Sequence, residues 1–571
     1  MDGFIRFIDA ARNGVLPERA AWRVLGAGMA VSALLGLWLG RDVSFTVDEY
    51  SWISLIGQNG LGDLFDPYVG HLIVIPRLIY WLVLELNGAS SYVVFQVLSL
   101  ASLFLMVGLL FVWLKKRVST WVALAPCLIL LIFPVDHLHY LTGNGITISL
   151  ALAFGLAALL AWERETRAGD LLAFVFLVLG ILSYTIALPF LIGLAVAAII
   201  GRQWRRLWIA LVPLIAYGVW RFVAVSDAVE KLEGGPEWDN LLLLPAWTFQ
   251  SIGAVLAALT GLGFDFSNVA GGPAVEQGRT LGPALATAAV LGLGWWLWKG
   301  RKVGPVFWVT GSILIALFAS QVLVWGTIEA RDPGAPRYLL PGAVVVVMVV
   351  AALLAGTKWG RGAFAGLWVI ALSSIVISIG ILANNTAWFE TVERGARAEI
   401  TALRLVESSG KQAVPPAAQP RERVRPEFSY ESSSEFGNLG FALEEVPGEP
   451  GWVGKRVDAF IAGSLRLGLR PLPPGSERPK GCRPATRNRN FVPYRIRLEI
   501  PSPGAILRAD AEVDLAMGRF GSWPSVDLGP IGEGGVRRLW LPFDRDETDW
   551  FIQATPERAG TLANLEICRF P

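Results

Sequence analysis

The sequence predicts a polytopic α-helical membrane protein with a small, mainly-β domain at its C-terminal end. Hydrophobic residues make up 54% of the 571 residues and charged residues only 17%. Apolar runs close to the roughly 20 residues that span a bilayer recur until about residue 383, after which the composition turns polar. A single soluble globule is therefore excluded. The net charge of +2 gives no reason to expect a nucleic acid partner.

About eleven apolar segments are predicted to cross the membrane. They are 21–40, 91–114, 118–134, 145–162, 171–185, 186–201, 206–223, 281–299, 303–325, 338–356 and 362–383. The first is long for the core of a signal peptide, and no convincing small-residue cleavage site follows it. We interpret it as a retained signal anchor.

Positive charge is sorted between alternate loops. One set of loops holds Lys115–Arg117, Arg202–Arg206 and Lys299–Lys302, whereas the opposite loops carry only scattered Lys and Arg. Short loops rich in Lys and Arg stay cytoplasmic. We therefore expect the N-terminus inside, everything after residue 383 outside, and a location in a bacterial inner membrane.

Two predicted outer loops are long, 41–90 and 224–280. In the first, Glu49 to Leu64 mixes apolar and polar residues, as in a helix that lies in the membrane interface. His71 to Leu86 is apolar but short for a span, which favours a re-entrant or surface-lying helix. In the second, the apolar stretch 241–262 is either half-inserted or a further span that would reverse the sidedness of everything after it.

The C-terminal part divides into a linker, 386–424, which is first helical and then rich in Pro, and a β domain, 425–571. The helix within the linker, at 387–408, is expected to be exposed, with charged pairs at i, i+3 and i, i+4 spacing. Period-two alternation predicts strands over 494–500 and 507–515, as in an antiparallel sandwich or jelly roll. Shorter strands are expected near 536–543, 549–554 and 562–570. The domain is a candidate carbohydrate-binding module, and a lid or stabilising role is the alternative.

The three cysteines separate into two groups. Cys127 lies inside an apolar span, where it is most simply a small core residue. Cys482 and Cys568 flank the terminal polar segment, so an oxidising compartment would allow a disulfide between them. Two separate thiols remain the alternative.

The acidic pair Asp48-Glu49 is the most informative polar feature, because it directly follows the first predicted span. Carboxylates beside a membrane are costly unless water, a cation or a reaction uses them. An aspartate there could act as a general base. The alternative is that the pair caps the helix that follows.

Further polar groups fall on the same predicted outer face, and the sequence contains no phosphate-binding Gly-Lys-Ser/Thr loop or zinc-protease motif. Arginine binds phosphate through a planar fork of donors, and histidine or aspartate can contact a sugar. The candidates for phosphate binding are Arg337, Arg331 and Lys231, and those for sugar binding are Asp136, His137, His139, His71 and Tyr338. Each has a plain alternative as a wet-turn residue or interfacial anchor.

In these features the chain resembles the GT-C superfamily of integral-membrane glycosyltransferases over residues 1–385. The resemblance rests on the many-spanning body, on Asp48-Glu49 early in a long first outer loop, on a second acidic position at Asp136, and on an extracytoplasmic C-terminal domain. It implies a polyprenyl-phosphate-linked sugar donor, a glycan, lipid or protein acceptor, and an inverting displacement. By that resemblance Asp48 is the base, with Glu49 second, and basic residues hold the phosphate.

The resemblance leaves open whether Asp136 binds acceptor, metal or nothing. No cofactor is required, although a divalent metal is open. Two rival functions stay in view: a transporter or flippase of a lipid-linked glycan, and a non-catalytic assembly protein. The transporter is disfavoured because the predicted spans are nearly free of internal charge.

Overall fold

The structure is a computed structural model that describes residues 10, 16–89, 91–133, 140–225, 237–262, 281–324, 333–408, 434–473, 481–484, 496–500, 504–520, 523–541, 550–556 and 565–568. The chain forms two compact units. Unit 1 comprises residues 1–45, 61–86 and 91–390. Unit 2 comprises residues 46–60, 87–90 and 391–571.

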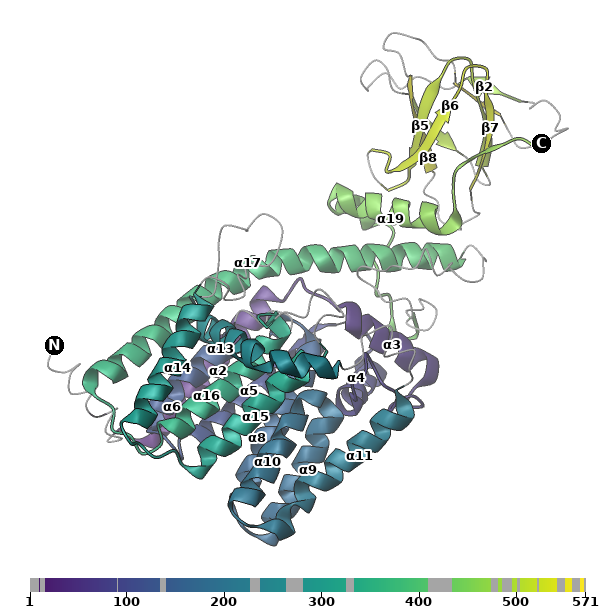
Figure 1. Ribbon diagram of the computed structural model, residues 1–571. Coiled ribbons are helices and arrows are strands. Elements are labelled where there is room, and N and C mark those ends of the chain that lie inside the picture. The colour runs from purple at the N-terminus through teal and green to yellow at the C-terminus, as the bar shows by residue number, and fades with distance from the viewer. Residues whose placement is uncertain are drawn as a thin grey trace. The chain divides into compact units, whose positions relative to one another are not determined.

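Unit 1 is a bundle of apolar helices (Figure 1). Its helices are α2 (Glu18–Leu39), α4 (Val74–Asn87), α5 (Val93–Leu114), α6 (Thr120–Leu131), α8 (Ile146–Trp162), α9 (Arg167–Ser183), α10 (Leu188–Ile200), α11 (Trp208–Ala224), α13 (Leu244–Thr260), α14 (Gly282–Trp298), α15 (Pro305–Val322), α16 (Pro336–Leu353) and the first part of α17 (Arg361–Ser408). Short 3₁₀ segments are η2 (Gly143–Gly145), η3 (Thr185–Ala187), η4 (Trp204–Arg206) and η5 (Trp238–Leu243).

Close helix crossings build the core of unit 1. A Cβ added to Gly155 in α8 would lie 2.6 Å from the ring of Phe190 in α10, so only glycine permits this approach. Buried polar side chains find partners nearby. Gln96 in α5 donates from Nε2 to the carbonyl oxygens of Gly40 and Leu141, at 2.7 and 3.1 Å. The core is therefore closely packed at this crossing, and the amide of Gln96 is hydrogen-bonded within it.

The predicted membrane body is confirmed at the level of fold class. In the described part of the chain, seven helical segments are long and apolar enough to cross a bilayer, and four shorter apolar helices accompany them. Ten of the eleven predicted spans overlap these segments, and the remaining one, 171–185, overlaps α9. The additional apolar segment is Trp238–Thr260, which contains α13.

Contacts of α13 favour the half-inserted alternative. Its first turn lies beside the last turn of α15, where Trp247 Nε1 is 3.4 Å from Gln321 Oε1. Its middle crosses the first residue of α14, because a Cβ at Gly253 would lie 2.6 Å from the carbonyl oxygen of Gly282. Both partners are at the helix ends remote from the Lys299–Lys302 loop.

The C-terminal end of α13 reaches no further across the bundle. Gly261, which follows α13 with a φ of +74°, lies against Ile377 of α17. Ile377 is in the part of the predicted span 362–383 that is remote from the Lys/Arg-rich loop at 358–361. The segment therefore lies across one side of the bundle, as the half-inserted alternative predicts.

Unit 2 contains the end of α17, helix α19 (Gly451–Leu465) and two antiparallel sheets. It also holds α3 (Val47–Asn59). One sheet has the strand order β1-β7-β4-β9-β2 and the other β3-β8-β5-β6. The strands are β1 (Leu469–Pro471), β2 (Arg483–Pro484), β3 (Ile496–Ile500), β4 (Gly504–Ala509), β5 (Val513–Gly518), β6 (Val526–Ile531), β7 (Val536–Trp540), β8 (Trp550–Pro556) and β9 (Leu565–Cys568).

A shared core makes the two sheets a sandwich. Leu507 and Leu539 come from one sheet, Leu515 and Ile552 from the other, and all four belong to one buried cluster. The mainly-β C-terminal domain predicted from the sequence is therefore confirmed as part of the fold class.

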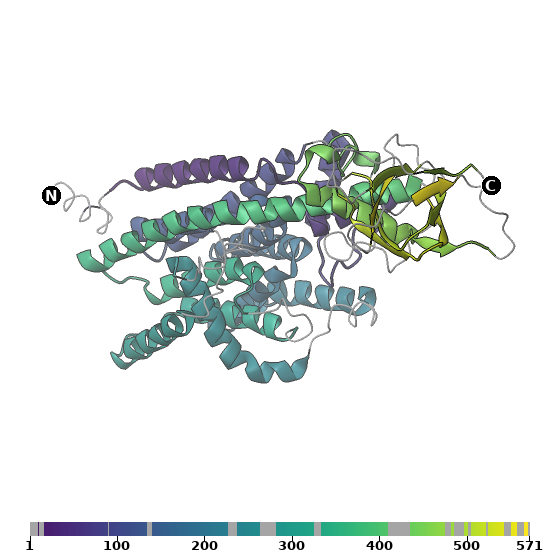
Figure 2. The same ribbon diagram turned by 90° about the horizontal axis from the view of Figure 1, so that it is seen from above.

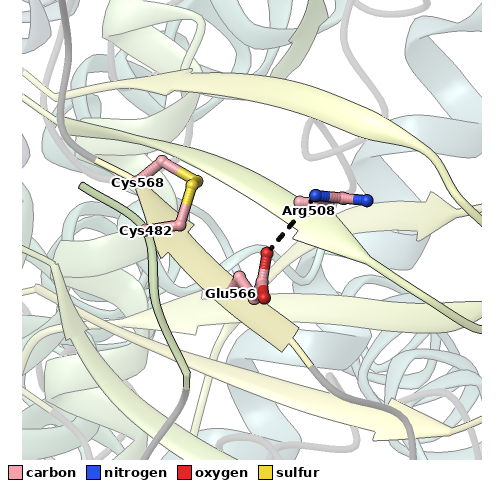
Figure 3. Close-up of a disulfide and its surroundings, with 4 residues drawn as sticks. All are labelled: Cys482, Arg508, Glu566 and Cys568. Atoms are coloured by element: carbon pink, nitrogen blue, oxygen red, sulfur yellow. Dashed lines mark ion pairs between the residues drawn. A yellow bond between two sulfur atoms is a disulfide. The ribbon is translucent and has the colours of Figure 1, made fainter. Parts of the chain in front are cut away.

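A disulfide between Cys482 and Cys568 joins the ends of strands β2 and β9 (Figure 3). Beside it, Arg508 of β4 and Glu566 of β9 form an exposed ion pair at 3.7 Å. An exposed pair of this kind contributes little to stability. The covalent link is therefore the stronger constraint at this edge of the sheet.

The structure corrects two expectations for this region. The predicted strand 507–515 is two strands, β4 and β5, because the chain passes from one sheet to the other at residues 510–512. The helix at 387–408 is not exposed. It is the end of the continuous helix α17, seen along its length in Figure 2. Ala398, Ala402 and Leu405 of this helix lie in the core of unit 2.

The charges of that helix are accommodated by pairing. Glu399 is only 3% exposed and accepts from Arg456 Nε of α19 at 2.8 Å. Arg397 lies 4.1 Å from the ring of Phe441. The i, i+4 charge pattern thus accompanies a packed helix, and α19 itself arises in a Gly/Pro-rich stretch where no helix was predicted.

Candidate functional site

The acidic pair lies in the first turn of α3, in unit 2. The helix begins after Thr46, whose extended backbone and hydroxyl are typical of an N-cap residue. Glu49 completes a capping box, since its Oε2 accepts from Thr46 N at 2.8 Å and from Thr46 Oγ1 at 2.9 Å. The Glu49 side chain is fully buried. Its visible task is therefore to hold the start of the helix.

Asp48 differs from its neighbour. It is only half-buried, in the same first turn. A partly accessible carboxylate can accept a proton from a hydroxyl placed beside it. Of the two acidic residues, Asp48 is the better candidate for chemistry.

His71 is held in place by a tight turn in unit 1. Tyr68 and His71 exchange both backbone hydrogen bonds, at 2.9 and 3.0 Å. The two residues between them, Val69 and Gly70, have φ of +49° and +70°, as in hairpin turns of type I′. A β-branched residue at positive φ is strained. The surrounding structure therefore imposes this turn, and with it the position of His71.

The imidazole of His71 contacts the segment that joins α9 to α10. Its Nδ1 lies 2.8 Å from Thr185 Oγ1, and its ring lies 4.5 Å from the ring of Tyr184. Sequence reasoning missed both partners, although Tyr184 and Thr185 end the predicted span 171–185 on the same predicted side as His71. The hydrogen bond at Nδ1 orients the imidazole ring, so a contact with a substrate would be made through Nε2.

Arg77 positions the segment that leads to this turn. Its side chain is buried, and Nη1 donates to the carbonyl oxygens of Asp63 and Asp66, at 2.8 and 3.1 Å. Its guanidinium also lies 5.6 Å from the ring of Tyr68. Arg77 therefore serves as a structural clamp on the first long loop within unit 1.

Arg337 and Tyr338 form the first turn of α16, which starts at Pro336. Both side chains are half-buried, and the guanidinium lies 5.1 Å from the phenol ring. A helix N-terminus and an arginine together favour an anion. This turn is therefore suited to phosphate in charge and in donor geometry.

The remaining candidates, Asp136, His137, His139, Lys231 and Arg331, lie outside the described residues. The chain on the far side of the first of these loops resumes at a buried residue, Tyr140, whose hydroxyl donates to the carbonyl oxygen of Ser32 at 2.7 Å. Among the described residues, no group of three His, Cys, Asp or Glu side chains is placed to hold a metal ion.

Comparison with known proteins gives a likeness to solved structures alone. No family model matches the chain, and no curated protein matches it. A solved structure that is similar to it is the crystal structure of ArnT from Cupriavidus metallidurans bound to undecaprenyl phosphate. The match is 17% identical, covers 68% of this chain and 80% of that chain, and has a TM-score of 0.39. No residue role is carried over from it.

Proposed function

We propose that the protein transfers a sugar from a polyprenyl-phosphate-linked donor to a hydroxyl acceptor of the cell envelope. The observation that carries the proposal is the division of labour at the start of α3. Glu49 is committed to the capping box, which leaves Asp48 as a half-buried carboxylate beside the predicted first span. From the charge pattern of the loops we expect this turn on the side opposite the cytoplasm.

In the proposed reaction the Asp48 carboxylate takes the proton of the acceptor hydroxyl. The freed oxygen attacks the anomeric carbon of the donor sugar, and the bond between that carbon and the phosphate oxygen breaks with inversion. Polyprenyl phosphate leaves with the electron pair and takes up the proton held by Asp48, directly or through water. Each bond that forms is thereby matched by one that breaks, and no redox partner is needed.

Arg337 would hold the leaving phosphate. Its guanidinium stands in the first turn of α16, where the helix dipole adds positive potential. Negative charge on the phosphate grows as its bond to the sugar breaks. A hydrogen-bond donor fixed beside the phosphate therefore lowers the barrier. Arg331 and Lys231 are proposed to assist. Tyr338 and His71 remain proposed contacts of a sugar, with Asp136, His137 and His139.

The test is transfer from a panel of radiolabelled polyprenyl-phosphate sugars by purified full-length protein, with and without EDTA. Asp48→Asn should lower transfer by about 10²- to 10⁴-fold, whereas the matched Asp42→Asn should not. Asp42 is an exposed residue of the same loop that pairs with Arg41 at 3.1 Å. Full activity of Asp48→Asn would remove the base role. Loss of activity in EDTA would add a metal to the site.

The proposed role of Arg337 in holding the phosphate is tested by binding as well as by turnover. Arg337→Gln should weaken binding of polyprenyl phosphate, measured by native mass spectrometry, whereas Arg41→Gln should not. Wild-type protein could bind the lipid-linked sugar, transfer it to no acceptor, and move it between the two leaflets of a vesicle membrane. In that case the flippase alternative replaces the proposal.

A further inference from the structure

The side of unit 1 that carries the Lys/Arg-rich loops contains an open hollow of about 640 Å³. Two loops form it, the turn between α8 and α9 and the connection between α10 and α11. It is lined by four arginines and two carboxylates, so two positive charges are in excess. We call the hollow with Arg167, Arg202, Arg205 and Arg206 the arginine pocket. None of its residues belongs to the candidate site described above.

Arg206 builds the pocket by joining its two loops. Its Nε donates to Asp170 Oδ1 at 2.8 Å, and its Nη2 donates to the carbonyl oxygen of Trp162 at 2.8 Å. Its guanidinium carbon also lies over the ring of Trp162, 3.5 Å from the ring centre. Nη1 is used as well, donating to Gln203. All three nitrogens of Arg206 thus have protein partners, and the residue links the two loops.

The backbone at the rim is strained on both loops. Glu165 and Arg202 have φ of +50° and +53°, the left-handed conformation that glycine or asparagine usually supplies after a helix. The strained residue is Arg202 and not the glycine before it, Gly201, which could adopt a positive φ without strain. Such outliers concentrate at functional sites. This geometry fixes the point at which the Arg202 side chain leaves the backbone at the rim.

The other three arginines have their charge available. Arg167, Arg202 and Arg205 are exposed, and the structure shows no ion pair for them within the described part of the chain. Trp204, between two of the arginines in the chain, is 59% exposed. An exposed Trp beside arginines at the end of membrane helices is typical of the headgroup region.

We propose that the arginine pocket binds the phosphate headgroup of an anionic phospholipid. The charge pattern puts this side of unit 1 at the cytoplasmic leaflet, whose anionic lipids attract basic groups. Arginine forks match phosphate oxygens, and Trp204 would rest against the glycerol and upper acyl region. The proposal is independent of the sugar transfer proposed above, since it involves the opposite end of the bundle.

The test uses delipidated full-length protein in neutral detergent, titrated with phosphatidylglycerol or with phosphatidylcholine and read by native mass spectrometry. Phosphatidylglycerol should bind with the lower Kd. The double variant Arg202→Gln/Arg205→Gln should raise that Kd by roughly 30-fold, from about fivefold for each basic residue. The matched control is Lys299→Gln/Arg301→Gln, which removes the same charge from exposed residues of another loop on that side.

Three outcomes would overturn the proposal. Equal losses in the two double variants would show diffuse surface attraction without a pocket. Equal Kd values for the two lipids would show that headgroup charge is not recognised. Competition by inorganic phosphate or glycerol phosphate at the same concentration would assign the pocket to a water-soluble phosphate rather than to a lipid.

Discussion

The two residues of the acidic pair are expected to respond differently to substitution. In Glu49→Ala, two donors of Thr46 lose their acceptor, and Thr46 is only 9% exposed. Each buried donor left unsatisfied costs about 1–3 kcal/mol, so the start of α3 loses at least about 2 kcal/mol. In Glu49→Gln, the amide oxygen can accept both bonds, and the loss is about 1 kcal/mol because a charged acceptor becomes neutral.

Hydrogen exchange of the amides in residues 46–60 of the full chain measures this difference. Local opening should speed exchange roughly 30-fold in Glu49→Ala and about fivefold in Glu49→Gln. Sugar transfer should survive in Glu49→Gln and fall by about 10²-fold or more in Asp48→Asn. The reasoning is refuted if Glu49→Gln abolishes transfer while exchange in α3 stays at the wild-type rate, since Glu49 would then act in the chemistry.

Three further predictions concern stability of the full chain. Burial raises the pKa of Asp458 to about 6 from 3.8, so the folded state holds the proton more tightly and stability should fall by up to about 3 kcal/mol as pH rises from about 4 to 6; limited proteolysis of α19 in urea should show this, and Asp458→Asn should remove it. Opening the disulfide between Cys482 and Cys568, which are 86 residues apart, should cost about 4–5 kcal/mol; unchanged protease resistance in reductant would contradict this. Gly253→Val should lower the melting temperature because its Cβ meets the backbone of α14 at 2.6 Å; Gly292→Val, with open space around it, is the control.

The membrane body could be predicted because a bilayer demands long apolar runs, and these are visible without knowledge of packing. The β region was harder. Alternation of polar and apolar residues continues through Asp510 to Glu512, so the change of sheet between β4 and β5 leaves no break in the pattern. Helix α19 was missed because glycines and prolines flank it, although its apolar face packs in the core of unit 2.

For the candidate site, roles that depend on neighbouring residues could be predicted from the sequence, whereas contacts between distant residues could not. Thr46 and Glu49 have the Ser/Thr-x-x-Glu spacing of a capping box, so the structural role of Glu49 was visible in the sequence as one of two alternatives. The contact of His71 with Thr185 joins residues 114 apart, and no local pattern reports it. The role of a residue in such a contact can be recognised only once the folded structure is known.

The course of α13 determines whether the proposed reaction has a consistent geometry across the membrane. Had Leu244–Thr260 crossed the bilayer, the basic loop Lys299–Lys302 would stand opposite the basic loop Lys115–Arg117, against the usual sorting of charge. The start of α16, with Arg337, would then face the cytoplasm while Asp48 faced the exterior. A base and a phosphate-holding arginine on opposite sides could not act on one displacement. The contacts of α13 with helix ends on one side only agree with the proposal, in which Asp48 and Arg337 both face the exterior.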